Sequence, residues 1–366
     1  MHPVRSPASQ GDRLGRLNLT ELVPRGRALE AAPGRITRTN MNSTATESAK
    51  EQVIARYGFH RVIEPKGVVP QAAWRVDNRP EQLHPSEKLI QVKLLNLDST
   101  STKQITESGI KIQDRIQEIV NERGKMHNPV TNSGGVLLAE YNGQAIVPWA
   151  SLSAIPLHLE SIGEVHGQQI DVVGTGVLFE SYHFTAVPEG MDWRLAATAL
   201  DIASLAVQVK RAVQERPIKR ALVIGCGNAG VAAMASIKKY SPTTEIFGAD
   251  VNNSNFKRIE DFGFSKNLGQ IDAANAQEII SFVSDCDLVV NCVNVANTEA
   301  SSVLAAREHG LVIFFSMATQ FDQASLATDA TGKDVVMQVA SGIARDEDKE
   351  ILALLKDYPN LLKITH

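Results

Sequence analysis

The sequence has few cysteines, no long hydrophobic run and no excess of basic residues. Its 366 residues include only three cysteines, at 226, 286 and 292. Three are too few for a disulfide framework or a four-cysteine zinc site, and they suit a reducing compartment. Apolar runs such as 311–315 have the length of a strand, far below the ~18 residues of a membrane span. With a formal net charge of −4, we expect a cytoplasmic globular protein without a nucleic-acid or membrane partner.

Residues 1–50 differ in composition from the remainder. They carry seven Arg and one Lys against four acidic residues, and no aromatic residue. Because they have no apolar stretch, they are not a secretory signal. Asp12, Glu21 and Glu30 also disfavour an organellar transit peptide. We expect either a disordered tail or a start site placed too early, with Met41 as the initiator.

The strongest local pattern is a glycine-rich turn after a short apolar run. Residues 221–224 predict a strand buried on both faces, and 229–239 predict a helix. The glycines between them have G-x-G-x-x-G spacing, which permits a tight turn, close approach to a pyrophosphate and close packing of helix on strand. The helix N-terminus offers free N–H groups to phosphate. The cofactor-binding residues expected here are Gly225, Gly227, Asn228, Ala229 and Gly230.

A carboxylate follows the next expected strand. The apolar stretch 245–249 ends in Asp250, twenty residues after the last glycine of the turn. Such a carboxylate can accept hydrogen bonds from the ribose hydroxyls of adenosine, and it repels a 2′-phosphate. NAD is therefore the expected cofactor. NADP stays possible because polar residues and Lys257 follow closely.

Strands and helices continue to alternate after this point. We expect strands at 287–291 and 311–316 with a helix at 298–308 between them, which predicts a doubly wound parallel sheet of the Rossmann type. Ligands of such a sheet bind at the carboxyl ends of its strands. The loop residues expected to line the cofactor and substrate crevice are Asn291, Val293, Asn294, Phe315, Ser316 and Thr319. The cysteines are expected to be small buried hydrophobic residues.

The region before the glycine-rich turn is predicted to be rich in β-strands. One amphipathic helix is expected at 109–123, and a linking helix at 192–213. The expected strands are 89–94, 135–140, 144–148 and 170–179.

A β-rich domain followed by a Rossmann domain suggests the α/β medium-chain dehydrogenase architecture, whose first domain is GroES-like. A last strand at 335–339 and a helix at 347–356 support this assignment. The expected domains are a tail at 1–50, a catalytic domain at 51–195 plus 340–366, and a dinucleotide-binding domain at 196–339.

Zinc is common in that architecture, but its ligands are missing from the sequence. No cysteine precedes Cys226, and no His-x-x-x-His pattern occurs. We therefore expect no zinc, and no other metal, in the site.

Several longer stretches share a further resemblance. They are 57–65 (YGFHRVIEP), 95–99 (LNLDS), 122–135 (ERGKMHNPVTNSGG), 179–181 (FES), 291–299 (NCVNVANTE), 314–319 (FFSMAT) and 332–335 (GKDV). Together they resemble the L-erythro-3,5-diaminohexanoate dehydrogenase family of lysine fermentation over residues 53–345. The resemblance implies NAD(P)-dependent, zinc-free oxidation of a 3-amino group, with release of ammonia and a 3-oxo acid. By analogy with the architecture, we expect a homodimer.

The sequence departs from that family in three places. The region 139–152 is shorter, and the glycine-rich turn is one residue shorter than in the family. After Gly342 the family has a Tyr-x-x-Gly-His segment, where this chain has Ile343 to Glu347. The cofactor site survives these changes, and the departures bear on the identity of the amine.

Amine oxidation without zinc leaves proton transfer to carboxylates and hydroxyls. A diamino acid carries two ammonium groups and one carboxylate, so we expect at least two acids and one cation in the site. The expected catalytic residues are Glu180, Asp98, Glu64 and Lys125, with Glu180 and Asp98 binding ammonium or acting as base and Lys125 binding the substrate carboxylate. The expected substrate-binding residues are Asn96, Asn128, His60, Arg61, Ser316 and Thr319. For each charged residue, a structural ion pair is an equal alternative.

Two other functions fit parts of the sequence. A zinc-free quinone or enone reductase of the same fold is one alternative. A nucleotide-binding protein that has lost catalysis is the other.

Overall fold

The computed structural model describes residues 50–129, 133–340 and 342–364. These residues belong to one compact unit, Ser48–His366. The prediction for residues 1–50 falls outside the described residues, apart from Lys50.

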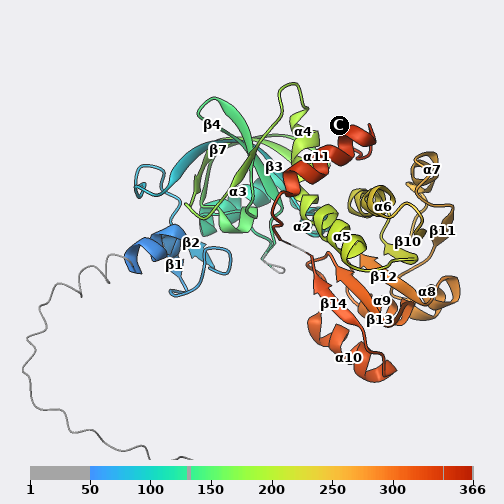
Figure 1. Ribbon diagram of the computed structural model, residues 1–366. Coiled ribbons are helices and arrows are strands. Elements are labelled where there is room, and N and C mark those ends of the chain that lie inside the picture. The colour runs from blue at the N-terminus through green and yellow to red at the C-terminus, as the bar shows by residue number, and fades with distance from the viewer. Residues whose placement is uncertain (1–49, 130–132, 341, 365–366) are drawn as a thin grey trace, which may run out of the picture. The chain divides into compact units, whose positions relative to one another are not determined.

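The first half of the described chain is built on an antiparallel sheet (Figure 1). Its order is β6-β7-β3-β4-β5-β8, and every neighbouring pair is antiparallel. The strands are β3 (Lys88–Asn96), β4 (Val136–Tyr141), β5 (Gln144–Pro148), β6 (Leu157–His166), β7 (Gln169–Leu178) and β8 (Phe184–Ala186). The four strands expected from the sequence in this region are confirmed.

Two helices accompany this sheet. Helix α3 (Ile112–Arg123) buries Ile116, Ile119 and Val120 in the same apolar core as the sheet. It begins three residues later than expected, because Gly109 has a φ of +72° and ends the preceding turn. Helix α2 (Ser99–Glu107), which the sequence pattern did not indicate, begins directly after Asp98.

The second half contains a parallel six-stranded sheet. Its order is β11-β10-β9-β12-β13-β14, which is the 3-2-1-4-5-6 order of a Rossmann domain. The strands are β9 (Arg220–Ile224), β10 (Glu245–Asp250), β11 (Asn267–Gln270), β12 (Cys286–Asn291), β13 (Ala306–Phe314) and β14 (Val336–Val339). The doubly wound α/β fold is confirmed.

The helices of this half are α6 (Asn228–Tyr240), α7 (Phe256–Asp261), α8 (Ala276–Phe282), α9 (Glu299–Ala305) and α10 (Phe321–Thr331). The helix expected at 298–308 was too long. Helix α9 ends at Ala305, and Ala306 already pairs with Cys286 in the sheet. The expected strand at 311–316 is part of β13, which starts earlier and ends at Phe314.

The linking helix expected at 192–213 is two helices, α4 (Trp193–Asp201) and α5 (Ala203–Glu215). The break lies at Ile202, whose φ of −111° and ψ of 3° are not helical. The first helix begins where the Asp192 carboxylate accepts the Leu195 N–H at 2.8 Å. The break leaves Asp201 as the last residue of α4, which matters for the site.

The last helix, α11 (Glu347–Asp357), packs against α4, α5 and α6 (Figure 1). The Glu350 carboxylate lies 2.7 Å from the Lys210 ammonium of α5, and Asp357 lies 2.7 Å from Lys239 of α6. Because α11 touches both the linking helices and a helix of the parallel sheet, the domain boundaries expected at 195 and 340 stay a prediction.

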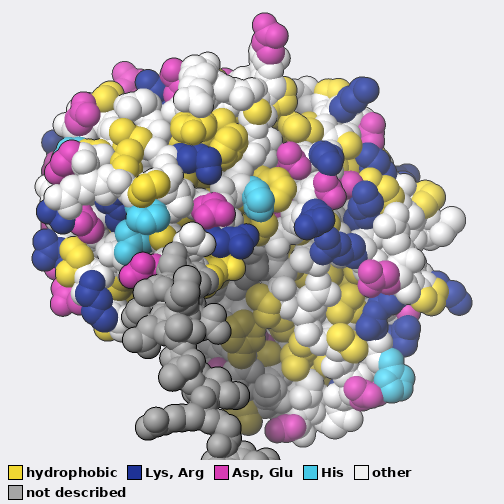
Figure 2. Space-filling view, turned by 60° about the vertical axis from the view of Figure 1, so that its left-hand side comes forward, with side chains coloured by type: hydrophobic (Ala, Val, Ile, Leu, Met, Phe, Trp, Pro, Cys, Tyr) yellow, Lys and Arg dark blue, Asp and Glu magenta, His cyan; other side chains and the backbone are white. Residues whose placement is uncertain are grey.

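No helix within the described ranges is long and apolar enough to cross a bilayer. On the face that Figure 2 presents, side chains of both charge signs are interspersed.

A buried ion pair holds the segment that precedes the antiparallel sheet. Arg61 donates to both oxygens of Glu87, at 2.8 and 2.6 Å, and to the carbonyls of Asp77, Arg79 and Gln82. His60 also contacts Glu87, at 2.8 Å. Burial alone would raise the pKa of Glu87, but the hydrogen bonds from His60 and Arg61 outweigh it and lower that pKa to about 2.

Replacing Glu87 should therefore destabilise the fold strongly. Glu87→Gln leaves the Arg61 guanidinium buried without its counter-charge, and we expect a loss of about 3–5 kcal/mol in the free energy of unfolding. Denaturant unfolding of purified protein measures this quantity, with the exposed Glu81→Gln as a matched control. An equal stability of the two variants would contradict a structural role for this pair.

The same pair sets a pH dependence. Because folding lowers the pKa of Glu87 from 4.5 to about 2, its contribution is present above pH 4.5 and is lost as the pH falls toward 2. The stability difference between wild type and Glu87→Gln should shrink over that window.

Candidate active site

The glycine-rich turn has the geometry of a dinucleotide site. Gly225 has a φ of +90°, which only glycine adopts at low cost. A Cβ on Gly230 would lie 1.8 Å from the Gly225 carbonyl oxygen, so α6 packs directly on the turn. A Cβ on Gly227 would meet no atom within 4 Å, which leaves its backbone open to a ligand. The Asp250 carboxylate accepts the N–H groups of Cys226 at 2.7 Å and Asn252 at 3.0 Å, beside this turn. These residues fit NAD or NADP.

The C-terminal segment also reaches this site, which sequence reasoning missed. The Asn228 side chain accepts the Lys363 N–H at 2.9 Å and donates to the Lys363 carbonyl at 2.8 Å. The Lys363 ammonium in turn donates to the Ser254 carbonyl at 3.3 Å. A residue that follows the last helix thus lies beside the loop after Asp250.

The carboxyl ends of neighbouring strands are held together by backbone hydrogen bonds. Gly225 donates to Ala249, and Cys292 donates to Ile224, each at 2.8 Å. Asn291 is buried and anchors its own loop, because its amide donates to Thr298 and Ser302 at 2.9 Å. Asn294 bridges the two halves, since it donates to Ser99 of α2 at 2.6 Å and accepts from Ser316 at 2.9 Å.

A cavity of about 610 Å³ opens at these strand ends. Its wall combines residues of both halves of the described chain, and its size is that of an ordinary ligand pocket. From the parallel-sheet half come Gly227, Asn228, Ala229, Gly230, Cys292, Asn294, Phe315, Ser316 and Met317. The acidic residues of the wall are Asp98, Asp201 and Glu347, and no Lys, Arg or His is among the described residues that line it.

Asp98, a residue expected from the sequence, caps helix α2. Its carboxylate accepts the Ser101 N–H at 2.8 Å, the Ser101 hydroxyl at 2.6 Å and the Ser133 hydroxyl at 2.9 Å. Asn96, two residues earlier, is buried and donates to Asp201 at 3.2 Å.

Asp201 was not expected from the sequence. It ends α4 and lines the cavity. Burial, and then the nearby charge of Asp98, raise the pKa of Asp201 to about 7, although the hydrogen bond from Asn96 acts in the opposite direction. No local motif marks this residue, because its partners lie about a hundred residues earlier in the chain.

Glu347 is the third carboxylate of the wall and was also missed. It is 4% exposed and accepts the Ala344 N–H at 2.6 Å. Burial is the main cause that raises its pKa to about 7. Glu347 stands where the related family is expected to have the histidine of its Tyr-x-x-Gly-His segment.

Four expected catalytic or substrate residues lie elsewhere. Glu64 and Glu180 are exposed and do not line the cavity. Lys125 is fully buried and donates to the carbonyls of Pro70 and Gln71 at 2.6 and 2.9 Å, and burial lowers its pKa to about 7. Arg61 is bound to Glu87, as described. The structure therefore supports structural roles for Lys125 and Arg61 rather than substrate binding.

The other expected residues discussed next also make structural contacts or lie outside the cavity wall. Asn128 is buried and donates to Ser101 at 3.0 Å and Gln104 at 2.9 Å, behind the Asp98 cap. Val293 and Thr319 are partly buried and do not line the cavity. His60 contacts Glu87.

The three cysteines are not paired with one another. Burial raises the pKa of Cys226 and Cys286 to about 12, and it also raises that of Cys292, so the thiols stay protonated at neutral pH. Cys292 lines the cavity as a small apolar residue.

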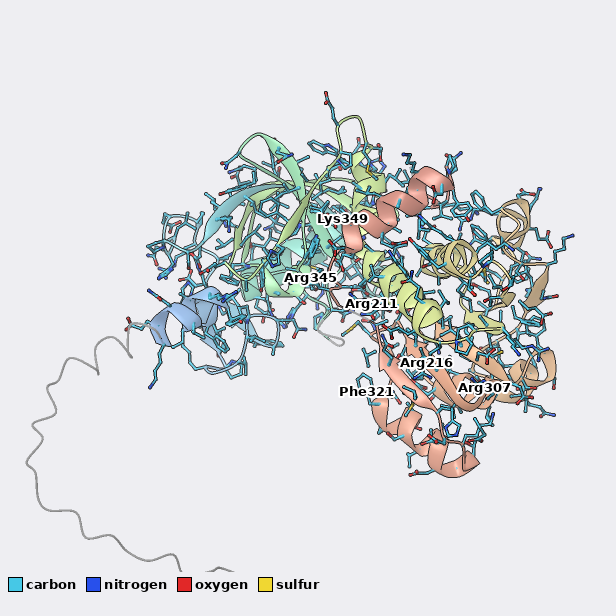
Figure 3. The ribbon with its side chains drawn as sticks, viewed as in Figure 1. Arg211, Arg216, Arg307, Phe321, Arg345 and Lys349 are labelled. Atoms are coloured by element: carbon cyan, nitrogen blue, oxygen red, sulfur yellow. The ribbon has the colours of Figure 1, made fainter. Side chains whose placement is uncertain are left out.

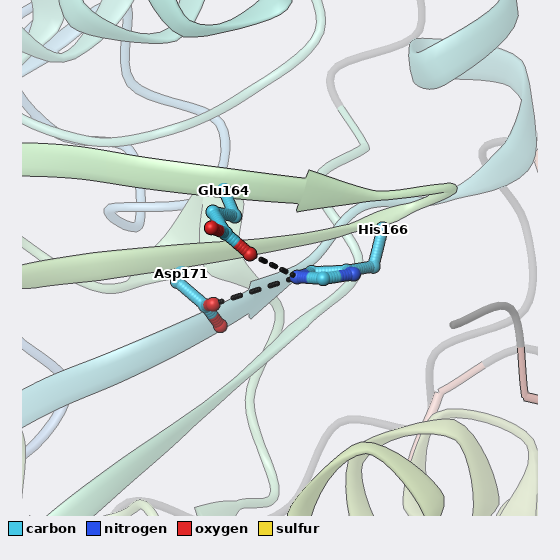
Figure 4. Close-up of side chains that lie close together, drawn as sticks. All are labelled: Glu164, His166 and Asp171. Carbon is cyan, nitrogen blue, oxygen red and sulfur yellow. Dashed lines mark ion pairs between the residues drawn. The ribbon is translucent and has the colours of Figure 1, made fainter.

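One further group of acidic and histidine side chains lies at the β6–β7 hairpin (Figure 4). The His166 Nε2 atom lies 3.4 Å from Glu164 and 3.7 Å from Asp171. Arg194 donates to both oxygens of Asp171 at 2.9 Å, so a guanidinium already neutralises that carboxylate. The group is a surface ion-pair network.

Solved structures that match the chain include a dehydrogenase and a reductase. Alcohol dehydrogenase from Thermus sp. ATN1 is 17% identical, with a TM-score of 0.46 over 79% of this chain and 86% of that one. Acetophenone reductase from Geotrichum candidum, solved with NAD, is 16% identical, with a TM-score of 0.48 over 79% and 83%. The fold assignment rests on the strand orders given above.

Sequence comparison is more specific. Residues 60–188 match the family model of the L-erythro-3,5-diaminohexanoate dehydrogenase N-terminal domain. The L-erythro-3,5-diaminohexanoate dehydrogenase of Fusobacterium nucleatum is 34% identical over 337 residues, which are 84% of this chain and 97% of the relative. That of Acetoanaerobium sticklandii is 34% identical over 330 residues, covering 82% and 95%. The chain therefore belongs to the L-erythro-3,5-diaminohexanoate dehydrogenase family.

Proposed function

We propose that the protein catalyses the NAD(P)-dependent oxidative deamination of L-erythro-3,5-diaminohexanoate to the 3-oxo acid. One observation carries the proposal: the glycine-rich turn and three carboxylates line the same cavity. A substrate with two ammonium groups matches that charge. A quinone or enone is neutral and offers these acidic groups no opposite charge, so a reductase of such substrates is disfavoured.

Besides the amine and NAD(P), the reaction consumes only water. The amine loses a proton, its C3 hydrogen leaves as hydride, and water adds to the resulting iminium carbon. The products are the 3-oxo acid, NAD(P)H, one ammonium ion and one proton. When the cofactor is bound at the glycine-rich turn, its nicotinamide ring would accept the hydride. The residues of the chain must bind the two ammonium groups and move the protons.

The wall provides groups for each part of the substrate. Asp98, Asp201 and Glu347 can bind the ammonium groups. Ser151 and Ser153 also line the cavity, with their hydroxyls 2.8 Å apart, and can donate to the substrate carboxylate. The expected cationic partner of that carboxylate is thus replaced by hydroxyl groups.

Asp250 favours NAD in this proposal. Its carboxylate lies beside the glycine-rich turn, where a ribose hydroxyl can donate to it and a 2′-phosphate would be repelled. We also propose that the enzyme acts in the cytoplasm, where its unpaired cysteines stay reduced.

A homodimer is proposed through the edge of the parallel sheet. Among the described residues, β14 pairs with β13 on one side only. Its side chains Val336, Met337 and Val339 are 43%, 38% and 47% exposed. Phe321, 60% exposed, lies at the start of α10 near this edge (Figure 3). An apolar strand edge pairs with a second copy of itself about a two-fold axis, which covers it on both chains.

The activity is tested directly with the purified full-length protein. We expect NADH formation from L-erythro-3,5-diaminohexanoate, with one ammonia released per NADH. Incubation without amine, and with a quinone plus NADH or NADPH, gives the controls. Absence of turnover with both NAD and NADP, in a protein that binds the cofactor, would contradict the proposed reaction.

Cofactor preference should follow the Asp250 charge. Asp250→Asn removes the repulsion of a 2′-phosphate and weakens a charged hydrogen bond to ribose, so the preference for NADH over NADPH should fall roughly tenfold or more. Fluorescence titration with each reduced cofactor measures both affinities. Asp261→Asn, an exposed carboxylate of the neighbouring helix, should leave the ratio unchanged, and an unchanged ratio in Asp250→Asn would refute the assignment.

The dimer is tested at the strand edge. Lysine at both Val336 and Val339 places like charges on the two edges, and light scattering after gel filtration should show a monomer. Val173→Lys, at a 54% exposed valine of β7, serves as the control and should stay dimeric. A wild-type monomer, or a dimer that survives both lysines, would rule this interface out.

A further inference from the structure

Two aspartates face the cavity from opposite ends of two helices. Asp98 precedes α2 and Asp201 ends α4, and both line the cavity beside the glycine-rich turn. Asp98 therefore lies at the start of one helix, and Asp201 lies at the break between α4 and α5.

Asp98 is fixed in place by its own hydrogen bonds. Its two oxygens accept three hydrogen bonds, from the Ser101 N–H and from the hydroxyls of Ser101 and Ser133, at 2.6 to 2.9 Å. These contacts cap α2 and hold the carboxylate in one orientation.

Asp201 has a different set of neighbours. The Gln169 amide donates to the Asn96 oxygen at 2.9 Å, which leaves the Asn96 NH₂ group to donate to one oxygen of Asp201 at 3.2 Å. Gln169 is itself held by the Arg194 carbonyl at 2.9 Å and the Thr198 hydroxyl at 3.0 Å, both on α4. The carboxyl of Asp201 is thus oriented by one amide.

We propose that Asp201 is the general base of the reaction and that Asp98, fixed by its hydrogen bonds, is the carboxylate that binds the cationic substrate beside it. This assignment rests on the proposed function. Asp201 first takes a proton from the reacting ammonium group, and after hydride loss it releases that proton to solvent. It next takes a proton from the water that attacks the iminium carbon. Asp201 then returns that proton to the amino nitrogen of the carbinolamine. The nitrogen leaves as ammonia, takes the proton of the carbinol hydroxyl group and departs as ammonium.

The electrostatic surroundings of Asp201 support this role. Asp98 and Glu347 are the titratable groups of neighbouring elements that share its cavity. Three of the cations on α4 or on the elements packed against it are paired elsewhere: Lys93 with Glu140 at 3.8 Å, Lys210 with Glu350, and Arg194 of α4 itself with Asp171. The other charged residues of those elements include Lys88 of β3, Arg211 and Glu215 of α5, and Lys356 of α11, and none of them lines the cavity. Burial and the Asp98 charge bring the pKa of Asp201 to about 7, which suits a base that works near neutral pH.

The test compares isosteric variants in the full-length enzyme. Asp201→Asn should lower kcat about 10²–10⁴-fold, the usual contribution of a general base, while NADH affinity by fluorescence titration stays unchanged. Asp98→Asn should mainly raise KM for the diamino acid. In wild type, kcat/KM should rise with pH through about 7, and Asp201→Glu should retain activity with a shifted profile. Asp329→Asn, an exposed residue of α10, is the matched control.

A second readout does not depend on turnover. Because folding raises the pKa of Asp201 from 3.8 to about 7, its contribution to stability is largest at low pH and is lost as the pH rises through 7. The Tm of Asp201→Asn minus the Tm of wild type should therefore increase as the pH is raised from 5 to 8. The same difference for Asp329→Asn should stay constant.

The outcomes separate the two proposals. If wild type turns over the diamino acid and Asp201→Asn keeps more than a tenth of its kcat with an unchanged pH profile, Asp201 is not the base. If wild type shows no turnover, the proposed function fails. The pH-dependent Tm difference then still reports whether Asp201 titrates near 7, and a flat difference would overturn its assignment as well.

Discussion

The hydrogen bonds of the Asp98 carboxylate fix one wall of the cavity. They begin helix α2 through Ser101 and hold the segment at Ser133. Because α2 begins at this cap, its first residue, Ser99, is placed to accept the Asn294 amide from the parallel-sheet half. One charged group therefore connects the end of β3, the first turn of α2 and, through one further hydrogen bond, the loop after β12. If this carboxylate were neutral, the cap and the contact between the halves would weaken together.

The two aspartates of the cavity differ in their surroundings. Asp98 caps α2 and accepts three hydrogen bonds. The break at Ile202 ends α4 at Asp201, whose carboxylate accepts one hydrogen bond from the Asn96 amide. Two identical side chains can thus serve one reaction in two ways, one as a fixed binding group and one exchanging protons near neutral pH.

Local sequence predicted the elements around the glycine-rich turn, but it did not indicate two of the three acidic residues that line the cavity. The glycine spacing, the strand before it and Asp250 are consequences of short-range geometry, which a sequence displays directly. Asp201 depends on Asn96, about a hundred residues away, and on a helix break that hydrophobic periodicity does not reveal. Glu180 and Lys125 lie in stretches shared with the family, but a motif does not show whether a side chain faces a cavity or a backbone carbonyl. For Lys125, burial against the Pro70 and Gln71 carbonyls decided the matter.

Two of the three segments expected to differ from the family reach the cavity. Within 139–152, residues 148–151 line it, and within 343–347 Ile343 and Glu347 do. The third expected departure, the shorter glycine-rich turn, keeps the spacing that a dinucleotide needs. At Glu347 a buried carboxylate lines the same cavity as the other two. Acidic groups in the wall favour substrates that carry an ammonium group. The shape of the wall then determines which amine of that class fits.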